Sequence, residues 1–92
     1  MKKEIKLVET CGACPEQYDA FIGKEQVGYL RLRHGYFRVD YPYSGGETIY
    51  EAEPKGDGLF EEFERNYYLG KAKEAIFQTI LKYNPELLKA GK

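Results

Sequence analysis

Two cysteines lie close together near the start of the chain, in the run Cys-Gly-Ala-Cys-Pro that ends at Pro15. At the spacing of Cys11 and Cys14, thiols can form a redox couple, supply half of a tetrahedral zinc site, or close a local disulfide. A thioredoxin-type couple needs a βαβ unit around it, whereas the residues that follow Pro15 alternate like strands. A zinc site needs two more ligands, and the chain has no second C-x-x-C and a single histidine, His34.

We therefore expect Cys11 and Cys14 to lie in a bend that is closed by a disulfide or lined by small, buried thiols. A redox couple remains an alternative. So does a zinc site, which two copies of the chain would have to share.

A second group of chemically interesting residues lies in two alternating runs, 26–33 and 36–41, which are separated by His34-Gly35. Two such runs around a two-residue connection ending in Gly predict a β-hairpin. In that register Leu30 and Leu32 face the core. The opposite face carries three arginines and two tyrosines: Arg31, Arg33, Arg38, Tyr29 and Tyr36.

Arg31 lies directly opposite Arg38 in this hairpin, which is unfavourable unless a negative charge neutralises the pair. The next strand offers Glu47, Glu51 and Glu53, and Asp40 is close by. A surface network of ion pairs is therefore our first interpretation of this face.

An anionic ligand is the alternative interpretation of the same five side chains. Arginines beside tyrosines on an exposed sheet are typical of surfaces that bind single-stranded nucleic acid. The formal net charge of −1 and the lack of an RNP-type consensus favour the ion network over nucleic acid.

Other catalytic patterns are missing from the sequence. A single His and a single Ser leave no triad, and no Gly-rich phosphate loop follows a strand. Glu61, Glu62 and Glu64 are explained by a helix start. We expect no cofactor or resident metal, and we predict a non-enzymatic binding or interaction module whose partner is another protein or a second copy of the chain.

The elements that would position these residues follow from hydrophobic periodicity. Strands are expected at 4–9, 17–22, 26–33, 36–41 and 47–52, and a long helix between Leu59 and Tyr83, with Asp57 as its N-cap and Asn84-Pro85 as its end. The pattern predicts an α+β fold, an antiparallel meander of four to five strands with the C-terminal helix packed on one face.

The expected helix has two apolar faces instead of one stripe. One contains Phe60, Phe63 and Tyr67, and the other contains Leu69, Ala72, Ile76, Ile80 and Tyr83. This predicts either burial on both sides or a differently oriented first segment that breaks near 66–70, with Gly70 as a point of close packing. The tail after Pro85 is expected to be loose.

Length and composition predict a single domain, 1–92, of ordinary globular balance, with 42% hydrophobic and 32% charged residues. No apolar run reaches the roughly 18 residues of a membrane span, and the first ten residues lack the apolar region of a signal peptide, so we expect a cytoplasmic protein without a membrane partner. Glu and Lys greatly outnumber Gln, Asn and Ser, a thermophile tendency that would permit a cytosolic disulfide.

The run "GYLRLRHGYFRVDYPYSGGETIYEAEPKGDGLFE" resembles small prokaryotic and phage-borne proteins of unknown function that share its order of hairpins, Gly-Asp-Gly loop and terminal helix. The resemblance extends from Pro15 to Ile80 and implies no activity. The hairpin "QVGYLRLRHGYFRV" also looks like the middle strands of GCN5-type acetyltransferases. The pyrophosphate-binding loop of that family is absent, so no catalytic residue or acetyl-CoA site is carried over.

Overall fold

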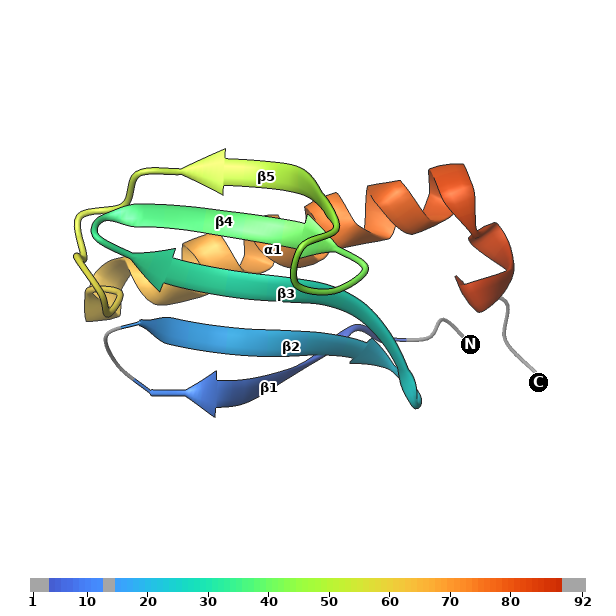
Figure 1. Cartoon of the computed structure of the whole chain (residues 1–92), viewed down its shortest axis with the longest axis horizontal. Coiled ribbons are helices and arrows are strands. Elements are labelled where there is room, and N and C mark those ends of the chain that lie inside the picture. Colours follow the sequence, from blue (N-terminus) through green and yellow to red (C-terminus); the bar gives the residue numbers. More distant parts are fainter. Residues whose placement is uncertain (1–3, 13–14, 89–92) are drawn as a thin grey trace.

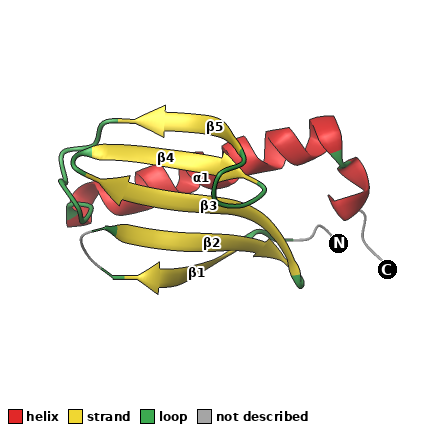
Figure 2. Cartoon of the chain, in the orientation of Figure 1, coloured by secondary structure: helices red, strands yellow, loops and turns green. Residues whose placement is uncertain are grey.

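Five antiparallel strands form one sheet in chain order, and one long helix crosses a single face of it (Figures 1 and 2). The computed structural model describes residues 4–12 and 15–88. The elements are β1 (Lys6–Cys11), β2 (Glu16–Ile22), β3 (Glu25–Arg33), β4 (Tyr36–Tyr41), β5 (Glu47–Ala52), α1 (Glu62–Tyr83) and a short 3-10 helix, Pro85–Leu88. The predicted α+β meander is confirmed.

The core lies between the sheet and α1. In the β3–β4 hairpin Leu30 pairs with Val39 and Leu32 with Phe37, as the alternation predicts. These four side chains are fully buried. Burial of each such side chain contributes roughly 1.5–3 kcal/mol. The hairpin register that orients the arginines is therefore fixed by the core on the other side of the same strands.

Gly28 in β3 lets the helix approach the sheet. A Cβ at this position would lie 2.6 Å from Cδ1 of Ile76 in α1 and 3.2 Å from the Cβ of Ala20 in β2. Any larger residue would force the helix or the side chain of Ile76 to move, because protein interiors are close-packed.

The turn between β3 and β4 is held from outside the hairpin. His34 and Gly35 have φ angles of 55° and 72°. Positive φ at both central residues is the signature of a type I′ turn, whose twist matches that of the strands. The Gly35 N–H donates to the carbonyl of Asp57 at 2.6 Å, which ties the hairpin tip to the loop that precedes α1.

The predicted helix start is wrong. Glu61, not Asp57, is the N-cap. The buried carboxylate of Glu64 accepts the backbone N–H groups of Lys55, Gly56 and Glu61 at 2.8–2.9 Å. These bonds fold the preceding loop under the end of the helix, so Asp57 stays within that loop.

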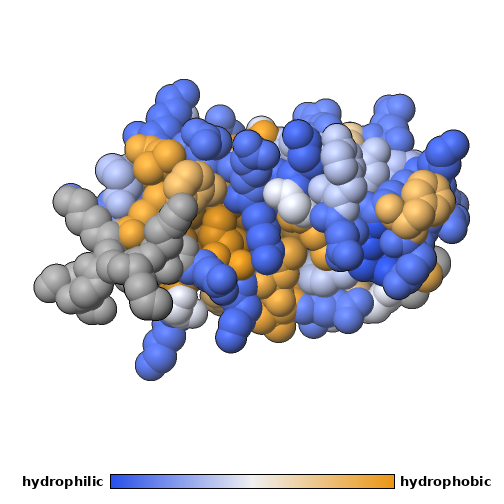
Figure 3. Space-filling view, turned by 180° about the vertical axis from the view of Figure 1, so that it is seen from behind, coloured by the Kyte–Doolittle hydropathy of each residue, from blue (hydrophilic) through white to orange (hydrophobic). Residues whose placement is uncertain are grey.

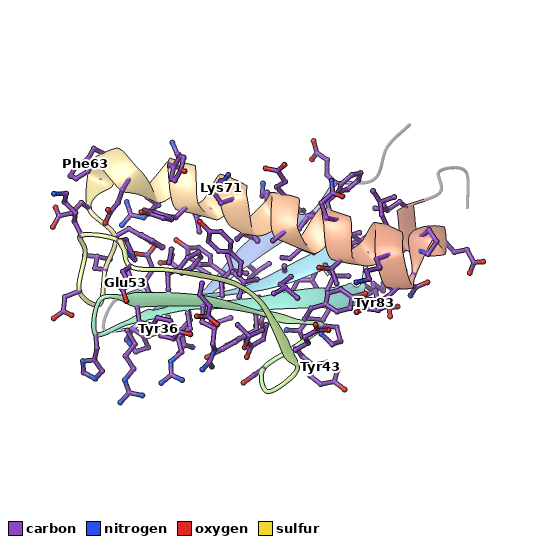
Figure 4. The ribbon with its side chains drawn as sticks, turned by 90° about the horizontal axis from the view of Figure 1, so that it is seen from above. Tyr36, Tyr43, Glu53, Phe63, Lys71 and Tyr83 are labelled. Carbon is purple, nitrogen blue, oxygen red and sulfur yellow. The ribbon has the colours of Figure 1, made fainter. Side chains whose placement is uncertain are left out.

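The predicted break in the helix is also wrong, because α1 is continuous from Glu62 to Tyr83. Phe60 is buried but precedes the helix, whereas Phe63 is 74% and Tyr67 60% exposed, so this face of α1 is not buried. Tyr83, expected on the other apolar face, is 56% exposed. A Cβ on Gly70 would meet nothing within 4 Å, so this glycine is not a packing point. Figure 4 shows Phe63 and Lys71 on the side of α1 that points away from the sheet.

The segment after α1 is more ordered than expected. Leu87 and Leu88 of the 3-10 helix are partly buried and pack against the core cluster. Seen from the helix side, hydrophobic patches lie among hydrophilic residues over the surface in Figure 3.

Candidate anion-binding site on the open sheet face

The two faces of the sheet have different surroundings. In Figure 4 the helix lies along one face, and the side chains of the other face project away from it. On that open face the β4–β5 loop covers one end of the strands (Figure 1). The rest of the open face is uncovered in the described part of the chain.

A row of polar side chains runs across this face at right angles to the strands. The register places Gln17 of β2 opposite Arg31 of β3, Arg31 opposite Arg38 of β4, and Arg38 opposite Glu51 of β5. Cβ atoms of directly opposed residues lie about 4.5–5.5 Å apart. The predicted pairing of two arginines is therefore present, with a glutamate on one side only.

Arg38 is the compensated member of this pair. Its Nε lies 3.2 Å from Oδ1 of Asp40, an ion pair without the alignment of a hydrogen bond. Asp40 is 2% exposed and also accepts hydrogen bonds from Thr48 Oγ1 at 2.9 Å and the Gly45 N–H at 3.3 Å. Of the ion network expected from the sequence, the described residues therefore form one ion pair, from Arg38 to Asp40, and none to Glu47, Glu51 or Glu53.

Arg31 and Arg33 have no such compensation. Neither side chain forms an ion pair with any residue that the structure describes. The Nε of Arg31 is shielded from solvent and has no hydrogen-bond acceptor among the same residues. A buried donor without an acceptor costs about 1–3 kcal/mol, more if it is charged. The row therefore keeps a positive charge that the described residues do not balance.

These side chains line a pocket of about 340 Å³ at the turn end of the β3–β4 hairpin. Its walls are Arg31, Arg33, His34, Tyr36 and Arg38, and we call it the arginine pocket. The volume lies within the range of small-molecule sites. Guanidinium groups bind carboxylate and phosphate oxygens through paired N–H donors, so the lining suits a compact anion.

Carboxylates flank the arginine pocket on one side, across Tyr36. A neighbouring pocket is lined by Tyr36, Glu51, Ala52 and Glu53. The Glu51 carboxylate lines this pocket together with the Tyr36 ring. Partial desolvation and then the charge of Glu51 raise the pKa of the Tyr36 hydroxyl above its usual value. The aromatic ring thus separates a positive pocket from a negative one.

A third pocket, of about 240 Å³, lies across the Arg33–His34 wall. It shares Arg33 and His34 with the arginine pocket, and its other lining residues are Asp57 and Gly58. The Asp57 carbonyl holds the hairpin tip, and its exposed side chain has no ion pair with a described residue.

Four of the five residues selected from the sequence for this face meet at the arginine pocket. Tyr29 does not line it, because it lies one pair further along β3, between Asp19 of β2 and Asp40 of β4. His34 was considered from the sequence only as a turn residue or a metal ligand. Its position in a two-residue turn beside Arg33 is the signal that would have placed it here.

A second charged cluster, on the helix side of the sheet, was missed entirely. Glu16 of β2 is 1% exposed. Arg65 of α1 binds its Oε2 through Nε at 2.9 Å, the Phe60 N–H binds its Oε1 at 2.9 Å, and the Tyr18 hydroxyl donates to Oε2. Burial alone would raise the pKa of Glu16, but these hydrogen bonds hold it below its usual value. The signal was available, since Glu16 shares the strand face of buried Tyr18 and Ala20.

The cysteine pair is described only in part. Cys11 ends β1 opposite Gln17, at half-buried exposure, and Cys14 lies outside the described residues. The disulfide, redox and zinc hypotheses therefore stay predictions. Within residues 4–12 and 15–88, no three His, Cys, Asp or Glu side chains are grouped as metal ligands.

No family model, no curated protein and no solved structure matches this chain. The likenesses noted from the sequence gain no support from these comparisons, and no residue role is transferred from a relative. Across the described residues, no helix combines the length and apolar character needed to cross a membrane.

Proposed function

We propose that the protein is a non-enzymatic binding module that takes single-stranded nucleic acid on the open face of its sheet. The observation that carries the proposal is the pair of uncompensated arginines, Arg31 and Arg33, at a pocket on that face. The overall charge of −1 counts against non-specific adhesion to nucleic acid, so the attraction has to be local.

Arg31, Arg33 and Arg38 are the residues that would bind phosphate oxygens. Arg31 and Arg38 stand in register on adjacent strands, so their guanidinium groups can approach one phosphate together. The bound anion would supply an acceptor near the shielded Arg31 Nε and relieve the repulsion between the two cations.

Tyr36 is the residue that would contact a base. Its ring is 39% exposed and forms the wall between the arginine pocket and the Glu51 side. Stacking of a base on an aromatic side chain contributes about 1–3 kcal/mol and is tolerant of sequence. Tyr29 lies one pair further along β3 than the pocket, flanked by Asp19 and Asp40, and we expect it to contribute less.

The test is fluorescence anisotropy with a labelled, single-stranded oligonucleotide at low salt, comparing the wild type with Arg31→Glu. We expect the substitution to weaken binding by at least about tenfold, because it places a carboxylate beside Arg38. The matched control is Lys73→Glu, an equal charge change at an exposed position of α1, which should alter binding less than about twofold.

Two results would contradict the proposal. One is a wild type that binds no oligonucleotide at about 50 mM salt, where electrostatic binding is strong. The other is equal loss of affinity in Arg31→Glu and Lys73→Glu, which would assign the effect to net charge alone.

A cytoplasmic location agrees with a nucleic-acid ligand and stays part of the proposal. A homodimer, the other partner expected from the sequence, also stays a prediction, which light scattering tests directly.

A further inference from the structure

We propose that the arginine pocket takes the phosphorylated end of a single strand, one terminal nucleotide with its phosphomonoester, instead of an internal stretch of phosphodiesters. The inference rests on the proposed function and concerns which part of the nucleic acid is recognised.

The first argument is the amount of charge. A phosphomonoester carries about −1.5 to −2 at pH 7, whereas each internal phosphodiester carries −1. The pocket presents two guanidinium groups without a carboxylate partner, Arg31 and Arg33, beside the partly compensated Arg38. One terminal phosphate therefore balances the excess charge of the pocket.

The second argument is what lies beyond the pocket walls. Past Tyr36 are Glu51 and Glu53, and past Arg33 and His34 is Asp57. Along β2 and β3, the next pair on the same face places the half-buried Asp19, which forms no ion pair with a described residue, beside Tyr29. A strand that continued in any of these directions would bring its next phosphate toward a carboxylate, which is repulsive at these short separations.

The third argument is that the neighbouring pocket at Asp57 suits the nucleoside attached to the bound phosphate. The pocket of Asp57 and Gly58 adjoins the arginine pocket through the shared Arg33 and His34. Its Asp57 carboxylate accepts hydrogen bonds, so it suits a sugar hydroxyl or a base amine attached to the bound phosphate. Asp57 is thus the residue that would favour a nucleoside over a second phosphate.

The experiment compares three labelled oligonucleotides of one sequence, carrying a 5′-phosphate, a 3′-phosphate or no terminal phosphate. We expect one of the phosphorylated ends to bind at least about tenfold more tightly than the unphosphorylated strand, because the monoester carries the larger charge. Adenosine monophosphate should compete and adenosine should not. Affinity should fall by less than about tenfold between about 50 and 200 mM salt, because a single terminal phosphate neutralises only about two charges.

Asp57→Lys tests the role of the flanking carboxylate. We expect it to strengthen binding of the unphosphorylated strand and to reduce the preference for a phosphorylated end to below about threefold. Glu74→Lys, the same charge change on exposed α1, should preserve the preference. Asp57→Asn removes the charge with little change in shape, and we expect it also to reduce the preference for a phosphorylated end. It provides the same test if the lysine variant does not fold.

The outcomes separate the two proposals. Equal binding of all three oligonucleotides by the wild type would overturn end recognition and leave nucleic-acid binding intact. A preference that survives both Asp57 variants would overturn the role of Asp57. Failure to bind any of the three would instead contradict the proposed function.

Discussion

The four arginines of the chain are divided between two clusters with opposite surroundings. Arg65, on the helix side of the sheet, meets the carboxylates of Glu16 and Glu62 at 2.9 and 2.8 Å and also donates to the Phe60 carbonyl. On the open face Arg31 and Arg33 have no carboxylate partner among the described residues, and only Arg38 has one.

This contrast separates charges that are balanced within the fold from charges that are not. Around Glu16 the donors and acceptors satisfy one another, and the network joins β2, the loop at Phe60 and α1. A complete network of this kind is costly to break, and its charges are satisfied without a ligand. The arginine pocket lacks carboxylate partners for Arg31 and Arg33 within the described chain, so we expect a bound anion to stabilise it.

The largest expected effect is that of Arg65→Met. The substitution leaves Glu16 buried without its charge partner, so we expect the free energy of unfolding to fall by about 3 kcal/mol or more. Urea denaturation measures it. The matched variant Arg33→Met on the open face should cost less than about 0.5 kcal/mol, because that side chain is exposed and has no ion pair.

If Arg65→Met does not fold, the double variant Glu16→Leu with Arg65→Leu addresses the same point. Removing both charges is less costly than removing one, so the double variant should regain part of the lost stability. Equal costs for Arg65→Met and Arg33→Met would show that the two clusters do not differ as described.

The second expected effect is a loss of stability at acidic pH, caused by the buried carboxylates Glu16 and Glu64. Hydrogen bonds hold the pKa values of Glu16 and Glu64 below their usual value of 4.5, despite the burial that opposes this shift. Their stabilising contribution is complete above the unfolded-state pKa and is lost as the pH falls through the lower folded-state values. We therefore expect the free energy of unfolding to decline below about pH 4.5.

Glu16→Gln should remove part of this acid dependence, since an amide does not titrate. Chemical denaturation at a series of pH values from neutral to acidic would reveal it. A variant whose pH profile parallels that of the wild type would argue against Glu16 as a contributor.

The smallest expected effect is a gain in stability on the open face of the sheet. Arg31→Gln removes one of two opposed cations and the shielded, unsatisfied Nε, so we expect stability to rise by about 0.5 kcal/mol. The same variant should bind oligonucleotide more weakly. Thermal denaturation and anisotropy on one preparation measure both quantities, and a loss of stability would place Arg31 with the structural charges instead.

Much of the fold was predictable because two periodicities dominate the sequence. The bounds of β4 and β5 and all the predicted pairs of the β3–β4 hairpin are confirmed. The start of the helix and the exposure of Phe63 could not be predicted. Apolar side chains at helical spacing do not reveal which of two stripes meets the sheet. Three backbone bonds to Glu64 decide where α1 begins, and they come from a loop without periodicity.

The candidate site was predictable where it depends on register and not where it depends on tertiary contacts. The opposition of Arg31 and Arg38 follows from the hairpin alone. The contribution of Asp57 depends on a loop that folds back to the hairpin tip, and the contact between Glu16 and Arg65 joins residues distant in the chain. The alternation within β2 can show that Glu16 is buried, but a pattern within one segment does not show which distant residue it meets.

The chain-order sheet has a consequence for folding kinetics. Every strand pairs with its neighbour in sequence, so loop closure costs little entropy, and we expect folding within milliseconds to seconds. The residues that line the arginine pocket all belong to the β3–β4 hairpin. The residues of the proposed anion site are therefore brought together by a single local hairpin, and only the loop at Asp57 has to arrive from elsewhere in the chain.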